Sequence, residues 1–175
     1  FNWRDTKHVW AGGAEVYLHE MAKRWVATGH SVTLFCGNDG HDPRNETIDD
    51  VNIIRRGGFY TVYFWAAIYY LLRLRGRFDV VIDSENGIPF FTPLFTRLPV
   101  FLLIHHIHQD VFRRQLPFPL AQFAMFLESR LMPFVYRRQK IVTVSESSKN
   151  DIVRIGLSRP QDIEIISPGI DPGQF

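Results

Sequence analysis

Hydrophobic positions along the chain follow two patterns. Apolar residues recur three and four residues apart from Ala14 to Val26, which predicts a helix that begins after Gly12-Gly13 and ends at Gly29. Elsewhere, short runs are apolar throughout, which is typical of buried strands. Further helices are predicted at residues 60–74, 89–96, 118–138 (bent at Pro133) and 145–155. Strands are predicted at residues 31–36, 51–54, 79–83, 99–104, 141–144 and 163–166.

Apolar strands that alternate with helices indicate a parallel sheet with helices on both faces. The sequence therefore predicts the α/β class, with a doubly wound parallel sheet in a single domain over residues 1–175. Residues 1–3 precede a polar stretch and are typical of the end of a strand whose beginning has been cut off. Residues 167–175 are expected to leave the domain as a loop.

Composition excludes several classes of protein. Hydrophobic residues make up 46% of the 175 and charged residues 22%, as in globular domains and unlike disordered or fibrous chains. A single cysteine, Cys36, excludes an internal disulfide framework and a cysteine-based zinc site. The net charge of +2 does not favour nucleic acid as a partner. We expect a cytoplasmic protein, because the longest uncharged apolar run, residues 59–72, is shorter than the roughly 20 residues that a membrane span needs.

The middle of the chain suggests a contact with the inner face of the membrane. Residues 51–140 carry 12 Lys or Arg against 5 Asp or Glu, and residues 60–70 are rich in Tyr, Phe and Trp. Aromatic and basic residues together are typical of a helix that lies on an anionic bilayer. The alternative is that these aromatic side chains pack between helix and sheet, with the arginines in solvent.

A glycine pair connects the first strand to the first helix. Gly12 and Gly13 let the backbone approach a ligand closely, and the helix start offers free N–H groups to a phosphate or carboxylate. The spacing matches neither the dinucleotide-binding glycine pattern nor a Walker loop. A tight turn with a good helix start is the alternative, and Glu15 is expected to complement the helix dipole.

A histidine cluster, IHHIHQD at residues 104–110, follows a predicted strand. His106, His108 and Asp110 alternate and would share one face of an extended segment, as metal ligands do, although we expect no metal. His105 or His106 with Asp110 also fits the base and orienting acid of some acyltransferases. Alternatively, His105 is a single active-site histidine at a strand end, or the cluster has no role beyond the surface.

Several short motifs occur in an order that resembles the N-terminal domain of family 4 retaining glycosyltransferases of the GT-B fold. They are Gly12-Gly13-Ala14-Glu15, Gly29-His30-Ser31-Val32, residues 99–105 (PVFLLIH), Val144-Ser145-Glu146 and Ser167-Pro168-Gly169-Ile170-Asp171. Each motif is weak alone, and the ordered set spans nearly the whole chain. His106 departs from the family pattern, in which one histidine is followed by a small or acidic residue.

The resemblance implies a Rossmann-like acceptor-side domain of an enzyme that uses a UDP-, GDP- or similar sugar donor, without a cofactor. The donor would bind mainly to a C-terminal domain that this chain does not include, so the fragment alone would be inactive. The resemblance places Gly12 and Gly13 at the donor diphosphate or sugar, and His105 at the reacting centre. Candidates for the lipid-linked or glycan acceptor are Arg4, Lys7, Glu85, Asn86 and His106. The competing functions are a His/Asp acyltransferase and a non-catalytic sugar- or nucleotide-binding module.

Overall fold

The computed structural model describes residues 1–169, apart from the side chains of Asp110 and Gln115. Its α-helices are α1 (Gly13–Ala27), α2 (Val62–Tyr69), α3 (Gln109–Gln115), α4 (Leu120–Phe126), α5 (Met132–Tyr136) and α6 (Glu146–Arg154). Its strands are β1 (Thr33–Cys36), β2 (Asn45–Ile48), β3 (Val51–Arg55), β4 (Val81–Glu85), β5 (Val100–Ile104), β6 (Lys140–Thr143) and β7 (Ile163–Ile165). π-Helical turns follow α2 (Tyr70–Leu74) and α4 (Leu127–Leu131), and 3₁₀ turns lie at Thr92–Leu94 and Pro160–Asp162.

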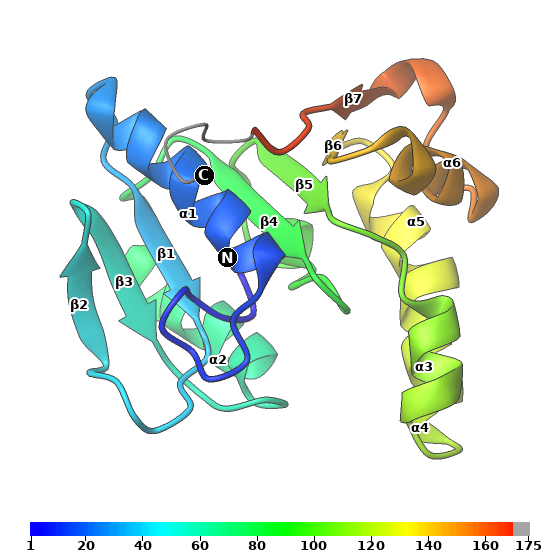
Figure 1. Ribbon diagram of the computed structural model, residues 1–175, viewed down its shortest axis with the longest axis horizontal. Coiled ribbons are helices and arrows are strands. Elements are labelled where there is room, and N and C mark those ends of the chain that lie inside the picture. Colours follow the sequence, from blue (N-terminus) through cyan, green and yellow to red (C-terminus); the bar gives the residue numbers. More distant parts are fainter. Residues whose placement is uncertain (170–175) are drawn as a thin grey trace.

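The strands form two groups, one of three strands in the order β1-β3-β2 and one of four parallel strands (Figure 1). β4, β5, β6 and β7 are parallel neighbours in that order, and β1 pairs in parallel with β3. Residues 1–3 join the two groups, because Asn2 N–H donates to Phe35 O of β1 (3.0 Å) and Ser84 N–H of β4 donates to Phe1 O (2.9 Å). With residues 1–3 at its centre, the order of the parallel strands is that of a doubly wound fold. The predicted fold class is confirmed, and residues 1–3 extend the sheet as expected.

Helices cover both faces of the sheet with separate apolar clusters. On one face, Leu18 and Ala22 of α1 pack with Val51 and Ile53 of β3. On the other face, α2, α5 and α6 pack against the sheet through buried residues such as Ala66, Met132 and Ile152. The two faces account for the continuous apolar character of β1 and β5, whose side chains alternate between the clusters.

The strand predictions differ from the structure at two places. β2 is absent from the prediction because it is polar and pairs antiparallel with β3 at the edge of the sheet, where one side faces solvent. Its turn into β3 holds Asp49 and Asp50 at positive φ, 50° and 60°. β4 lies two residues later than the predicted 79–83, so that Glu85, rather than Asp83, ends the strand.

The predicted helices differ from the observed ones in where the helix is interrupted or absent. Residues 89–96 form only a 3₁₀ turn, because buried Asp83 accepts hydrogen bonds from Phe90 N–H (3.0 Å), Thr92 N–H (3.1 Å) and the Thr92 hydroxyl (2.8 Å) and so holds this segment in a loop. The predicted helix at 118–138 is α4, a π-helical turn and α5, with Pro133 in the first turn of α5, directly after the π-helical turn. α3 was not predicted. Among the described residues, no helix is both long and apolar enough to cross a membrane.

Candidate functional site

The glycine loop is braced by one buried carboxylate, that of Glu15. Its Oε2 accepts from Gly12 N–H (2.7 Å) and its Oε1 from the Asn86 amide (3.1 Å), while the Arg4 guanidinium contacts both oxygens at 3.3 Å. The expected role as a helix N-terminal acid is only part of its function, because the same carboxylate ties the loop before α1 to the loop after β4. Three predicted site residues, Arg4, Gly12 and Asn86, therefore meet at Glu15.

The backbone of the glycine loop does not itself require glycine. Gly12 has an extended φ of −142°, and a Cβ there would meet nothing closer than Glu15 Oε2 at 3.7 Å. A Cβ on Gly13 would meet no atom within 4 Å. The open space in front of Gly13 is thus left free by the protein and is available to a ligand at the N-terminus of α1.

His105 lies directly after β5, at the carboxyl edge of the sheet. It is 7% exposed, its Nε2 is 3.2 Å from the Ser84 hydroxyl, and the Tyr17 ring of α1 meets it edge-on at 5.7 Å. Its carbonyl accepts from the Ser148 hydroxyl (2.8 Å), which links it to the first turn of α6. That helix is capped as predicted, because Ser145 Oγ accepts from Ser148 N–H.

Burial governs the charge of His105. Loss of solvent lowers the pKa of its imidazole to about 4, the nearby Glu15 carboxylate opposes this effect, and His106 and His108 add to it. At neutral pH the side chain is therefore a neutral hydrogen-bonding group. In this form one ring nitrogen donates and the other accepts.

His106 and Glu85 belong to a neighbouring cluster. The exposed His106 ring lies on that of His108, with centroids 3.9 Å apart. Glu85 is fully buried, and its Oε1 accepts from Gly87 N–H (2.9 Å) and lies 3.3 Å from His108 Nδ1. Glu128 completes the cluster from the π-helical turn, accepting from His108 N–H at 2.5 Å.

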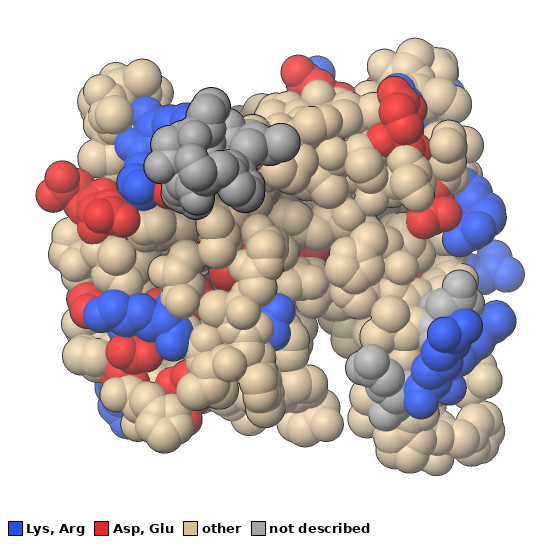
Figure 2. All heavy atoms as spheres, in the orientation of Figure 1, with Lys and Arg blue, Asp and Glu red and all other residues tan. Residues whose placement is uncertain are grey.

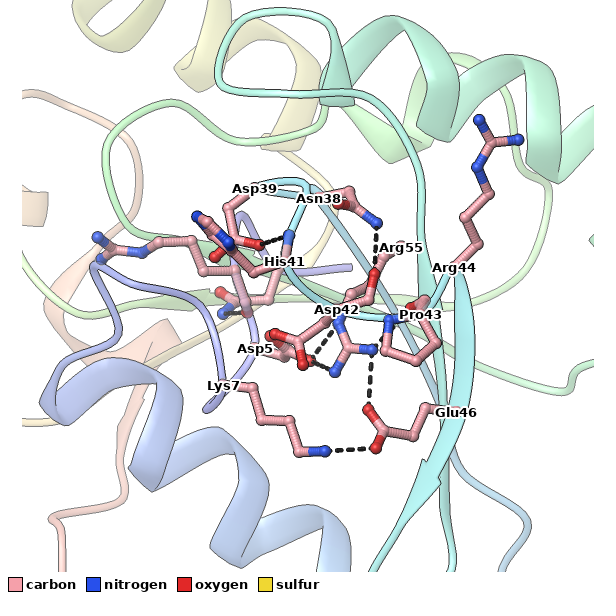
Figure 3. A network of polar contacts seen from close by, with 12 residues as sticks. Asp5, Lys7, Asn38, Asp39, His41, Asp42, Pro43, Arg44, Glu46 and Arg55 are labelled. Atoms are coloured by element: carbon pink, nitrogen blue, oxygen red, sulfur yellow. Dashed lines mark hydrogen bonds and ion pairs between the residues drawn. The ribbon is translucent and has the colours of Figure 1, made fainter.

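Lys7 lies in a different network, next to β2 and β3 (Figure 3). Its ammonium group pairs with Glu46 of β2, which also accepts from Arg55 of β3 (2.9 Å). Arg55 is buried and is paired with Asp5 as well. The structure thus does not bring Lys7 to the group around Glu15.

Ser84 and Glu128 help to organise the site but were not singled out from the sequence. Glu15 was singled out only as an acid at the start of a helix. Glu128 lies within the predicted helix at 118–138 and Ser84 directly follows the predicted strand at 79–83, and nothing in their local pattern marks them. Glu15 was identifiable at the third helical position, where an acid reaches back to the preceding N–H. The side chain of Asp110, the acid of the acyltransferase alternative, lies outside the described residues, as do Ile170 and Asp171.

The site lies where doubly wound folds bind their ligands, outside the carboxyl ends of the strands. A hollow of about 550 Å³ lies at the opposite edge, lined by residues such as His30, Ser31 and Asp79 that precede β1 and β4, and is separate from this site. The chain is accordingly a doubly wound α/β domain with a glycine loop and a buried histidine at the carboxyl edge of its sheet.

Comparison with known proteins identifies the family. Residues 11–174 match the family described as Glycosyltransferase Family 4, and the chain belongs to that family. No match was found among curated proteins. The resemblance expected from the ordered motifs is confirmed, and with it a general role in glycosyl transfer.

Proposed function

We propose that the chain is the acceptor-side domain of a retaining hexosyltransferase that uses a nucleotide sugar in glycolipid, cell-envelope or polysaccharide glycosylation. The observation that carries the proposal is the glycine loop, held by Glu15 beside open space at Gly13. Family membership supports glycosyl transfer in general.

The donor diphosphate or its sugar would lie against Gly12 and Gly13. The first N–H groups of α1 and the positive end of its dipole favour negative charge there. The diphosphate leaves as an anion, so fixed amide dipoles that stabilise it lower the barrier without a metal or cofactor. The Gly12 N–H already donates to Glu15, so the amides available to the donor begin at Gly13.

His105 would contribute a neutral hydrogen bond at the reacting centre. The hydroxyl of Ser84 and the Tyr17 ring hold the imidazole in place, and its low pKa keeps it uncharged. The acceptor, a lipid-linked molecule or a glycan, would lie beside Asn86, Arg4 and the exposed His106. The remaining donor contacts would come from the C-terminal domain that the family resemblance implies.

The experiment that tests this function is a screen of UDP- and GDP-sugars with the full-length protein. Release of nucleoside diphosphate identifies the donor, and NMR of the product reports whether the anomeric configuration is retained. Absence of turnover with every sugar nucleotide and acceptor tested would contradict the proposal.

Gly13→Ala separates function from stability. The added methyl enters open space, so the free energy of unfolding should stay the same or rise by about 0.5–1 kcal/mol. Because the methyl fills the space proposed for the donor, kcat/KM for the sugar nucleotide should fall by about tenfold or more. Gly58→Ala is the matched control, since a Cβ there meets nothing closer than 3.9 Å. If the two variants were equally active, the proposal that the donor lies against Gly13 would be contradicted.

A further inference from the structure

Three buried titratable side chains converge from distant parts of the chain, at the carboxyl ends of β4 and β5. Glu85 ends β4, His108 follows β5, and Glu128 lies in the π-helical turn after α4. One ligand-type atom from each lies within 4.8 Å of the others. Both carboxylate side chains are fully buried, and the imidazole is 9% exposed.

Each of the three side chains keeps a buried polar atom without a hydrogen-bond partner. Glu85 uses Oε1 to accept from Gly87 N–H, and Glu128 uses Oε1 to accept from His108 N–H. The second oxygen of each carboxylate and His108 Nδ1 have no hydrogen bond. Such groups cost free energy unless something satisfies them, so a ligand at this point is favoured.

The charge of the cluster is also uncompensated. Among the described residues, neither Glu85 nor Glu128 has a lysine or arginine within ion-pair distance. Burying two carboxylates without a cation is costly, because each of them loses its hydration. A cation bound between the carboxylates would remove that cost.

We infer that Glu85, His108 and Glu128 form a binding site for one divalent transition-metal ion. One imidazole nitrogen with two carboxylate oxygens is a donor set typical of Zn²⁺, Mn²⁺ or Fe²⁺, whereas Mg²⁺ prefers oxygen and water. The separation of 3.3 Å between Glu85 Oε1 and His108 Nδ1 is close to the roughly 3.4 Å edge of a tetrahedron with bonds of about 2.1 Å. Glu128 would close on the ion by a small side-chain rotation.

The backbone hydrogen bonds would orient the ligands. Gly87 N–H and His108 N–H each hold one oxygen of a carboxylate, as outer partners do at protein metal sites. The ion would tie the segment from α3 to α5 to the ends of β4 and β5, beneath the exposed His106. The site differs from the sequence-based set of His106, His108 and Asp110 in two of its three ligands. The inference does not depend on the proposed function.

The test is metal binding by the chelator-treated full-length protein, with Zn²⁺ for calorimetry and Co²⁺ for visible absorption. We expect one ion per chain, a cobalt band that saturates at one equivalent, and a melting temperature about 5–10 °C higher at a hundredfold excess over Kd. Glu85→Gln and Glu128→Gln keep an oxygen for the backbone N–H and remove the charge. Each should weaken binding by about tenfold or more.

Glu20→Gln serves as the control, since Glu20 is half-buried on α1 and pairs only with Lys23 and Arg24 among the described residues. It should bind the metal as the parent protein does. The inference is overturned if the parent protein shows no saturable binding, or if all three variants bind alike. If a glutamine variant fails to fold, the cobalt titration of the parent protein still decides, because a cluster that binds no metal gives no saturable band.

Discussion

At the scale of single residues, His105 is the side chain on which the proposed chemistry depends most. In His105→Ala, kcat/KM should fall by about 10²–10³-fold, because a positioned hydrogen-bonding group at the reacting centre is lost. His106→Ala should cost less, since its ring is exposed and lies against His108 rather than Ser84. Steady-state kinetics of both variants check this, with circular dichroism to confirm the fold. A larger loss in His106→Ala would favour the acyltransferase alternative.

The buried imidazole of His105 also links stability to pH. Its pKa is about 4 in the folded protein and near 6.5 in the unfolded chain, so between these values the unfolded state binds the proton and folding is disfavoured. His105 should therefore lower the free energy of unfolding by about 2 kcal/mol from pH 7 to pH 5. His105→Gln should lose less stability over this interval than the parent protein, as measured by urea unfolding. Parallel curves for the two proteins would show that His105 takes up its proton equally in both states.

At the scale of elements, the sequence predicted correctly those features that one short segment determines by itself. The Gly29 end of α1 and the Ser145 cap of α6 are local, and both are observed: Gly29 N–H donates to Val26 O at a φ of +92°, and Ser145 Oγ accepts from Ser148 N–H. β2 and the loop at residues 89–96 depend on hydrogen bonds to a neighbouring segment, because β2 pairs with β3 across a short turn and Asp83 holds Phe90 and Thr92. Apolar periodicity does not report such hydrogen bonds, so β2 was missed and residues 89–96 were predicted as a helix.

The aromatic side chains of residues 60–74 and of α3 and α4 are partly packed in the core and partly exposed, so neither core packing nor membrane contact accounts for all of them. Val62, Ala66 and Tyr70 of the α2 region are buried in the core, whereas Phe64 and Leu72 are 67% and 74% exposed. The projection formed by α3 and α4 also exposes large apolar side chains, among them Phe118, Phe123 and Phe126. Lysine and arginine side chains gather on this projection, at the lower right of Figure 2. Core packing thus accounts for only part of the aromatic content, and a membrane-facing role for α3 and α4 remains a proposal.

We therefore expect the protein to bind anionic vesicles through α3 and α4. Sedimentation with vesicles should show binding that rises with anionic lipid and falls with salt, because each basic residue near the surface contributes about 1 kcal/mol that salt screens. Replacing both Arg113 and Arg114 by glutamine should weaken binding to the vesicles by about tenfold or more. Replacing Arg154 and Arg159, exposed side chains near α6, serves as the matched control. No binding at low salt would point to an acceptor in solution.

At the scale of the whole molecule, the sequence predicted which candidate residues share one edge of the sheet but not how their side chains meet there. A parallel sheet brings the ends of its strands to one edge, and this placed the glycine loop, Asn86 and His105 near one another in advance. The contacts that organise the edge cross between segments, as when Glu15 meets Asn86 at 3.1 Å or Glu128 meets His108 N–H. These depend on the packing of α1 and of the π-helical turn on the sheet, which no local pattern specifies.

This domain on its own presents only one wall of the proposed active site. Transfer of a sugar requires donor and acceptor to be held in near-attack geometry, which is worth several kcal/mol of the barrier. The groups proposed to hold them, at Gly13 and His105, lie along one edge of one sheet, and the family resemblance assigns most donor contacts to a second domain. We therefore expect the 175-residue chain alone to fold but not to turn over a sugar nucleotide, measured as release of nucleoside diphosphate. The matched comparison is the same chain joined to its donor-binding domain. Turnover by the single domain within about tenfold of the joined protein would mean that this edge of the sheet is a complete active site.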